Sequence, residues 1–192
     1  MTSLLSDVIS LNRDSKKHVP EFRFPLVPTL DAAHCSVWER HLGEVASHWE
    51  QRKATPELWN QIPETSGLYM FVWKVPVGFD VEGKGMQYFR CLLYCGQAGA
   101  NESSGTLRKR YKTEYSKYLK GDPSQLFATS TPSGRKEELS RWLLLEPLEY
   151  WWAEVSDKSQ LAALEKELIR ILAPPLNVQH KVLRPAVRRP AF

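Results

Sequence analysis

Residues 67–77 read GLYMFVWKVPV, and residues 88–94 read YFRCLLY. Both stretches are rich in aromatic and β-branched residues, a composition typical of β-strands. Successive side chains of a strand point to opposite faces, so the first stretch is expected to present two faces: Tyr69, Phe71 and Trp73 on one, and Leu68, Met70 and Val72 on the other. The segment between the strands, residues 78–85 (GFDVEGKG), holds three glycines and predicts a long hairpin loop.

Helices and one further strand are predicted around this hairpin. Apolar residues recur at helical spacing in four other segments: residues 31–53, 106–120, 135–145 and 158–172. Residues 148–155 (LEYWWAEV) predict a third strand, and Asp157 with Gln160 resembles a capping pair for the last helix. The order of elements predicts an α+β fold, a small three-stranded antiparallel sheet flanked by helices with an N-terminal helical extension.

The chain of 192 residues is expected to have three parts. Residues 1–60 form an extension, irregular at first and then helical. Residues 61–178 form the main domain, and residues 179–192 form a basic tail. Hydrophobic residues make up 42% of the chain and charged residues 25%, which is ordinary for a globular protein. The net charge of +4 is compatible with a nucleic-acid partner but does not require one.

Membrane and disulfide classes are disfavoured. The cysteines Cys35, Cys91 and Cys95 have no metal-ligand spacing and leave an odd thiol in any disulfide scheme, so reduced cysteines are expected. No apolar run approaches the roughly 18 residues that a membrane-spanning helix needs. Residues 1–17 lack the basic-then-apolar order of a signal peptide. The sequence therefore predicts a soluble cytoplasmic protein.

Glu165 stands out on the last predicted helix. Its neighbours at −4, +3, +4 and +7, which share its helix face, are all apolar: Leu161, Leu168, Ile169 and Leu172. A carboxylate within an apolar stripe is costly unless a partner or a metal ion compensates it. A buried salt bridge, a solvated edge position and a metal ligand all explain the pattern, and the residues alone leave these alternatives open.

The helix predicted over residues 106–120 is strongly basic. It carries six basic residues against the single acid Glu114: Arg108, Lys109, Arg110, Lys112, Lys117 and Lys120. A solvated basic face explains this pattern, and so does a surface that contacts nucleic-acid phosphates.

These separate motifs together resemble the GIY-YIG nucleases. The motifs are Gly67-Leu68-Tyr69, Tyr94-Cys95-Gly96, the basic helix with Arg110, and Glu165 followed by Pro174 and Asn177. The family includes homing endonucleases, the incision subunit of bacterial nucleotide-excision repair and some restriction enzymes. In the family pattern an asparagine stands twelve residues beyond the glutamate with a proline between them, and Glu165 and Asn177 have that separation. The resemblance covers residues 62–178.

The resemblance implies a Mg²⁺- or Mn²⁺-dependent DNA endonuclease and assigns roles to five residues. Glu165 is implied as the metal ligand, and Asn177 belongs to the catalytic set. Tyr69 is implied as the general base for the attacking water, with Tyr94 supporting the water or the phosphate. A free phenol has a pKa near ~10, so the base needs a cation nearby. Arg110 is implied to supply that cation and to bind the scissile phosphate.

The glycines of the two tyrosine motifs, Gly67 and Gly96, are expected to let a bulky substrate approach the sheet. DNA contacts are expected from Gln97 after the second motif and from the other cations of the basic helix: Arg108, Lys109, Lys112 and Lys117. The tail cations Arg184, Arg188 and Arg189 are expected to form either a DNA-backbone arm or a solubilising tail.

The sequence departs from the family pattern in three places. The stretch between the tyrosine motifs is longer, through residues 75–89, and the loop at residues 101–105 is expanded. Glu114 stands where some members carry histidine or tyrosine. A restriction or phage-defence nuclease is the leading expectation, a structure-specific repair or recombination nuclease is next, and a non-catalytic DNA-binding module is the alternative class. A palindromic target would favour a homodimer.

Overall fold

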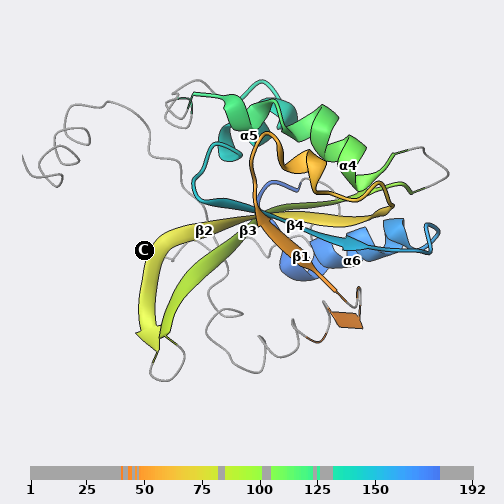
Figure 1. The fold of residues 1–192 in the computed structure, drawn as a ribbon, viewed down its shortest axis with the longest axis horizontal. Helices are drawn as coiled ribbons and strands as arrows, with labels where there is room; N and C mark the ends of the chain where they lie inside the picture. The colour runs from red at the N-terminus through yellow and green to blue at the C-terminus, as the bar shows by residue number, and fades with distance from the viewer. Residues whose placement is uncertain are drawn as a thin grey trace, which may run out of the picture.

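The computed structural model describes residues 48–81, 85–100, 105–122 and 132–177, together with Arg40, Gly43, Glu44, Ala46 and Gln125. The fold is α+β, as predicted. A four-stranded sheet has the order β1-β4-β2-β3, and every neighbouring pair is antiparallel. Helices cover both faces of this sheet (Figure 1).

The prediction of three strands is wrong, because a fourth strand, β1 (Glu50–Lys53), pairs with β4 (Leu148–Glu154). These residues were predicted as the end of a helix over residues 31–53, most of which lies outside the described residues. The sequence of β1, EQRK, has no apolar alternation, because the strand is at the edge of the sheet and is held by backbone pairing. Leu58 of the short helix η1 (Leu58–Asn60) is also buried in the core, so this segment packs with the sheet although it was assigned to the extension.

The central hairpin is longer than predicted. Strands β2 (Gly67–Val81) and β3 (Gly85–Ala98) pair as far as Val81 and Gly85, so most of the expected loop at residues 78–85 is strand. The outer part of the hairpin continues away from the helices (Figure 1). The register shifts between Lys74 and Gly78, the segment that contains Pro76. Proline cannot donate to a ladder hydrogen bond and is therefore found at such irregular positions.

One face of the sheet packs against the middle helices. These are α4 (Leu107–Arg110), the π-helical turn η2 (Tyr111–Tyr115), the short helix η3 (Tyr118–Lys120) and α5 (Arg135–Trp142). The core on this face is unusually aromatic: it contains Tyr69, Phe71, Tyr94, Tyr111, Tyr115, Tyr150 and Trp152. The predicted alternation of β2 is confirmed, because Tyr69 and Phe71 lie in this layer and Leu68, Met70 and Val72 lie in the other.

The opposite face packs against α6 (Leu161–Leu172). The predicted apolar stripe is confirmed, since its four members are all buried: Leu161, Leu168, Ile169 and Leu172. The helix begins at Leu161, three residues later than predicted. Asp157 instead stabilises the preceding turn, where its carboxylate accepts hydrogen bonds from Ser159 and from the side chain of Gln160.

Candidate active site

Tyr69 lies in the interior of the aromatic layer, at the centre of the predicted site. It is 1% exposed, and its hydroxyl shares a 2.6 Å hydrogen bond with the hydroxyl of Tyr115. Its ring also stacks on that of Tyr150 at 5.7 Å. Burial is the main cause that raises the pKa of Tyr69 well above its usual range, and Tyr115 and Tyr94 add to it. The Tyr69 hydroxyl is therefore held inside the fold by Tyr115, and its role as general base stays a prediction.

The two motif glycines make room for the protein's own atoms. A Cβ on Gly96 would lie 2.5 Å from the Tyr69 hydroxyl, and a Cβ on Gly67 would lie 2.1 Å from the carbonyl oxygen of Ala153. The space above each glycine is therefore filled from within the fold. The expectation that these glycines admit a substrate does not match this packing.

Tyr94 occupies a different position, on the wall of a cavity of about 400 Å³. Its neighbour in β3, Leu93, has no partner in the register with β2, because Phe71 pairs with Tyr94 and Val72 pairs with Leu92. Such bulges re-aim side chains and occur beside active sites. The cavity lies between β3 and the middle helices, and its lining residues are Tyr94, Arg110, Thr113, Glu114, Tyr115, Lys117, Tyr118, Lys136 and Leu139.

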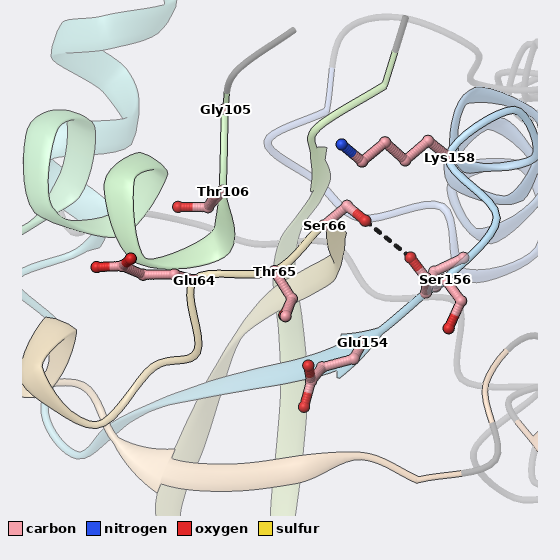
Figure 2. A pocket seen from close by; sticks show the side chains of 9 residues that line it. Glu64, Thr65, Ser66, Gly105, Thr106, Glu154, Ser156 and Lys158 are labelled. Carbon is pink, nitrogen blue, oxygen red and sulfur yellow. Dashed lines mark hydrogen bonds between the residues drawn. The ribbon is translucent and has the colours of Figure 1, made fainter. Parts of the chain in front are cut away.

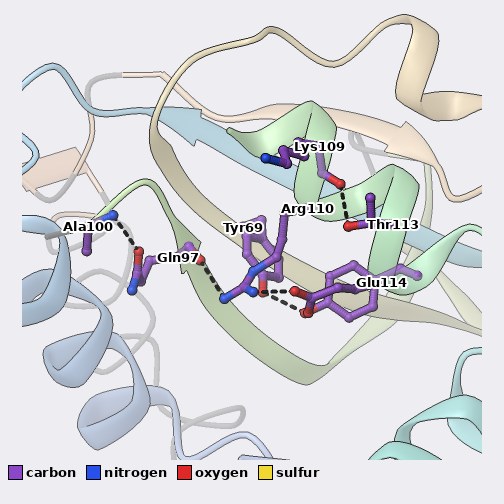
Figure 3. Close-up of polar contacts among 8 residues, drawn as sticks. Tyr69, Gln97, Ala100, Lys109, Arg110, Thr113 and Glu114 are labelled. Atoms are coloured by element: carbon purple, nitrogen blue, oxygen red, sulfur yellow. Dashed lines mark hydrogen bonds and ion pairs between the residues drawn. The ribbon is translucent and has the colours of Figure 1, made fainter. Parts of the chain in front are cut away.

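Arg110 extends from the end of α4 across the edge of β3 (Figure 3). One terminal nitrogen, Nη1, donates to the carboxylate of Glu114, one helical turn further on. The other, Nη2, lies 3.5 Å from the carbonyl oxygen of Gln97. The buried Nε has no hydrogen-bond partner among the described residues. Arg110 thus retains donor capacity beside Tyr69 and the cavity.

The electrostatic environment of Arg110 keeps it charged. Burial acts to lower the pKa of the Arg110 guanidinium, but the surrounding Tyr69, Glu114 and Tyr115 raise it, and the net pKa is raised. The pKa of Tyr115 is also raised well above its usual range, first by burial and then by Tyr94. The centre of the site is therefore a permanent cation surrounded by phenols.

Glu165 lies half-buried on α6, on the sheet face opposite to Tyr94. It is near Cys95, the residue that follows Tyr94 in β3. Burial raises the pKa of the Cys95 thiol and the charge of Glu165 raises it further. Tyr94 and Glu165 therefore flank the same edge strand from its two sides.

Asn177 connects α6 to that strand. Its side-chain Oδ1 accepts a hydrogen bond from the backbone N–H of Cys95 at 2.9 Å, and its Nδ2 donates to the Cys95 carbonyl at 2.8 Å. Asn177 is 2% exposed. These contacts fix the segment that follows α6 against β3, and the place of Asn177 in the catalytic set stays a prediction.

The capacity of this region to hold a metal ion rests on one carboxylate, that of Glu165. No group of three His, Cys, Asp or Glu side chains that could enclose a metal ion occurs in the described part of the chain. Glu165 offers one half-exposed carboxylate, and Mg²⁺ characteristically keeps several waters and binds through one or two carboxylates plus substrate phosphate. Glu165 could serve as the single protein ligand of such a cation, and that role stays a prediction.

The predicted DNA-contacting residues divide into two groups. Arg108 is engaged within the protein, since its Nε donates to the Ile62 carbonyl at 2.7 Å and its Nη1 lies 2.7 Å from a Glu64 carboxylate oxygen. The side-chain oxygen of Gln97 accepts from the Ala100 N–H (Figure 3).

The lysines, by contrast, lie on the surface. Lys109, Lys112 and Lys117 are exposed, with Lys112 stacked over the Trp59 ring at 3.9 Å. Arg184, Arg188 and Arg189 lie outside the described residues.

No family model, curated protein or solved structure matches this chain. In the described part of the chain, no helix is long and apolar enough to cross a membrane.

Sequence reasoning missed two members of the site. Tyr115 is buried on the helical segment after Arg110, and helical spacing gives no indication that its hydroxyl meets that of Tyr69. Lys136 joins Lys117 on the cavity wall from α5, a contact between separate elements that no local pattern predicts.

A second cavity, of about 310 Å³, lies at the start of β2 (Figure 2). Ser66 and Val155 bond across its wall, from the Ser66 hydroxyl to the Val155 carbonyl at 2.8 Å and from the Val155 N–H to the Ser66 carbonyl at 3.1 Å. Its charged lining residues are Glu64, Glu154 and Lys158. None of the five residues implied as catalytic lines this cavity.

Proposed function

We propose that this protein is a metal-dependent DNA endonuclease of the GIY-YIG type, with its site across the edge of β3. One observation carries the proposal. Tyr94 and Arg110 line one basic cavity, and Glu165 flanks the same strand on the other face, near Cys95. Residues far apart in the sequence thus border a single strand edge, and their chemistry is that of phosphodiester hydrolysis.

In this proposal Arg110 binds the scissile phosphate. A guanidinium binds phosphate oxygens through two parallel hydrogen bonds and remains charged, so it stabilises the negative charge that develops during the reaction. Tyr94, on the cavity wall, is the group that contacts the attacking water or the phosphate. Tyr69 and Tyr115 act as positioning residues, because their shared hydrogen bond fixes the surface beneath Arg110.

Glu165 is the residue that would hold the divalent cation. A bound Mg²⁺ or Mn²⁺ supplies Lewis-acid stabilisation to the departing oxygen. Asn177 fixes α6 against β3 and so sets where the Glu165 carboxylate lies relative to Tyr94. The lysines around the cavity contribute attraction for the DNA backbone, as does Lys109 on the neighbouring surface.

The test is cleavage of supercoiled plasmid and of single-stranded DNA with Mg²⁺, with Mn²⁺ and with chelator. Glu165→Ala should abolish cutting, whereas Glu167→Ala, a matched change two residues away on the same helix, should retain it. Tyr94→Phe should lower the single-turnover rate by about 10²–10⁴-fold, the usual worth of a proton-transferring or water-orienting group. Tyr69→Phe should lower it by about tenfold, since only a positioning hydrogen bond is lost.

The pattern of products separates the alternatives. Discrete metal-dependent fragments support a sequence-selective nuclease of restriction type, and nicking of branched or damaged DNA supports a repair or recombination nuclease. Salt-sensitive DNA binding without cutting of any substrate contradicts the enzyme proposal and leaves a binding module.

A further inference from the structure

The guanidinium of Arg110 is held by a residue of its own helix. Glu114 is one turn beyond Arg110, and its carboxylate accepts from Nη1 (Figure 3). The other terminal nitrogen makes only the long 3.5 Å contact with the Gln97 carbonyl, and the buried Nε has no partner among the described residues. The ion pair with Glu114 is therefore the main contact that orients this fork of donors.

The cavity around this pair is otherwise cationic. Its described charged lining residues are Arg110, Lys117 and Lys136, together with the single carboxylate of Glu114. Three cations around about 400 Å³ favour an anion, but the Glu114 carboxylate already accepts from Nη1 of Arg110. An anion that enters the cavity must compete with this carboxylate.

We propose that Glu114 is an electrostatic latch on Arg110, which a phosphate group of the ligand displaces on binding. The inference deepens the proposed function, and it rests on that function only for the identity of the ligand as a nucleic-acid backbone. A phosphate can accept two hydrogen bonds from the Arg110 guanidinium, whereas Glu114 accepts from only one of its terminal nitrogens. Glu114 is 45% exposed, so its carboxylate can turn into solvent when it is displaced.

The latch lowers the affinity of the cavity for all anions, and it lowers it most for anions that cannot replace Glu114 on Arg110. Glu114 keeps the Arg110 fork oriented in the absence of ligand and opposes anions that cannot replace its hydrogen bond. A phosphate group can replace that bond and can also interact with Lys117 and Lys136. Removal of the Glu114 charge should therefore tighten phosphate binding, and the gain should depend on the guanidinium.

The test is a titration of the full chain with inorganic phosphate in the presence of chelator, followed through the ¹H–¹⁵N resonance of Arg110 Nε and through the backbone amide resonances of Thr113 and Tyr115 on the cavity wall, which remain observable when Arg110 is replaced. The Arg110 Nε resonance is assigned by its loss in Arg110→Lys. Glu114→Gln should tighten phosphate binding by about two- to fivefold, the range expected for a partly exposed ion pair. Glu154→Gln, which removes the same charge beside the other cavity, should leave the affinity unchanged. In the double variant with Arg110→Lys, Glu114→Gln should give no gain.

Three results would overturn the latch. These are an unchanged affinity in Glu114→Gln, an equal gain in the Arg110→Lys background, or no shift of the Arg110 resonance at any phosphate concentration. This experiment measures phosphate binding and not DNA cleavage, so its result can contradict the latch without contradicting the nuclease, and the cleavage assay can do the reverse. A protein that binds phosphate more tightly as Glu114→Gln but cuts no DNA refutes the nuclease and retains the latch.

Discussion

The side-chain amide of Asn177 pairs with the backbone of Cys95 in the way that a neighbouring strand would. Oδ1 accepts from the Cys95 N–H at 2.9 Å, and Nδ2 donates to the Cys95 carbonyl at 2.8 Å. The preceding residue, Leu176, donates its N–H to the Leu93 carbonyl at 3.0 Å. The segment after α6 therefore covers the outer edge of β3 and determines where Glu165 lies.

Replacement of Asn177 should destabilise the protein strongly, although Asn177 lies outside the helices and strands. Asn177→Ala removes two buried hydrogen bonds and leaves the Cys95 N–H and carbonyl unsatisfied, which should cost about 2–4 kcal/mol of unfolding free energy. Asn177→Asp should be at least as damaging, because its second oxygen would face the Cys95 carbonyl.

Chemical denaturation provides the measurement, with Asn60→Ala as the matched control. Asn60 is exposed at the end of η1, so its replacement should change stability by less than about 0.5 kcal/mol. Equal stabilities of the two alanine variants would contradict the positioning role of Asn177.

Gly96 should tolerate no side chain, because Tyr69 occupies the space above it. A Cβ there would lie 2.5 Å from the Tyr69 hydroxyl and 2.6 Å from the ring carbon that carries it. Gly96→Ala should therefore lower stability by about 1–3 kcal/mol, the usual cost of overpacking. Gly134→Ala is the control, since a Cβ at Gly134 meets nothing within 4 Å. Thermal unfolding of both variants measures the difference, and a harmless Gly96→Ala would show that Tyr69 can move aside.

The sequence was most informative where one face of an element is buried. The alternation of β2 and the apolar stripe of α6 were both predicted correctly, because burial imposes a period on the side chains. Strand β1 was missed because its four polar residues carry no such period. The hairpin extension was missed because its glycines resemble a loop, although backbone pairing continues to Val81 and Gly85.

The arrangement of the candidate site was not predictable from the sequence, and the roles of its residues stay predictions. The family resemblance assigned roles to Tyr69 and Tyr94, yet only the packed sheet shows that Tyr94 lines the cavity and that Tyr69 does not. The Tyr69–Tyr115 hydrogen bond joins residues 46 positions apart. Such contacts depend on how the helices pack on the sheet, and local sequence patterns do not predict that packing.

Alkaline pH should unfold the protein through its buried tyrosines. Burial is the main cause that raises the pKa of four tyrosines: Tyr69, Tyr111, Tyr115 and Tyr150. Their contribution to stability is complete below the unfolded-state pKa near ~10. Above that pH the unfolded chain loses these protons while the folded chain keeps them, so stability falls by about 1.4 kcal/mol per pH unit for each group until its folded pKa is reached.

Absorbance of tyrosinate near ~295 nm and circular dichroism measure the two events in parallel. Of the seven tyrosines in the chain, these four should ionise only together with the loss of tertiary structure. Ionisation of all seven before any unfolding would contradict the buried positions of Tyr69 and Tyr150.

Arg108 and Lys109 should affect DNA binding differently although they are adjacent. The guanidinium of Arg108 is bound to the Ile62 carbonyl and to Glu64, whereas Lys109 is exposed. Arg108→Ala should lower stability by about 1–2 kcal/mol through these lost contacts and leave the salt dependence of DNA affinity unchanged. Lys109→Ala should leave stability unchanged and reduce the slope of log affinity against log salt by about 1, the effect of one lost phosphate contact. Denaturation curves measure the stability of both variants, and DNA titrations with chelator at several salt concentrations measure their slopes. A slope change in Arg108→Ala as large as that in Lys109→Ala would show that Arg108 leaves Glu64 to contact DNA.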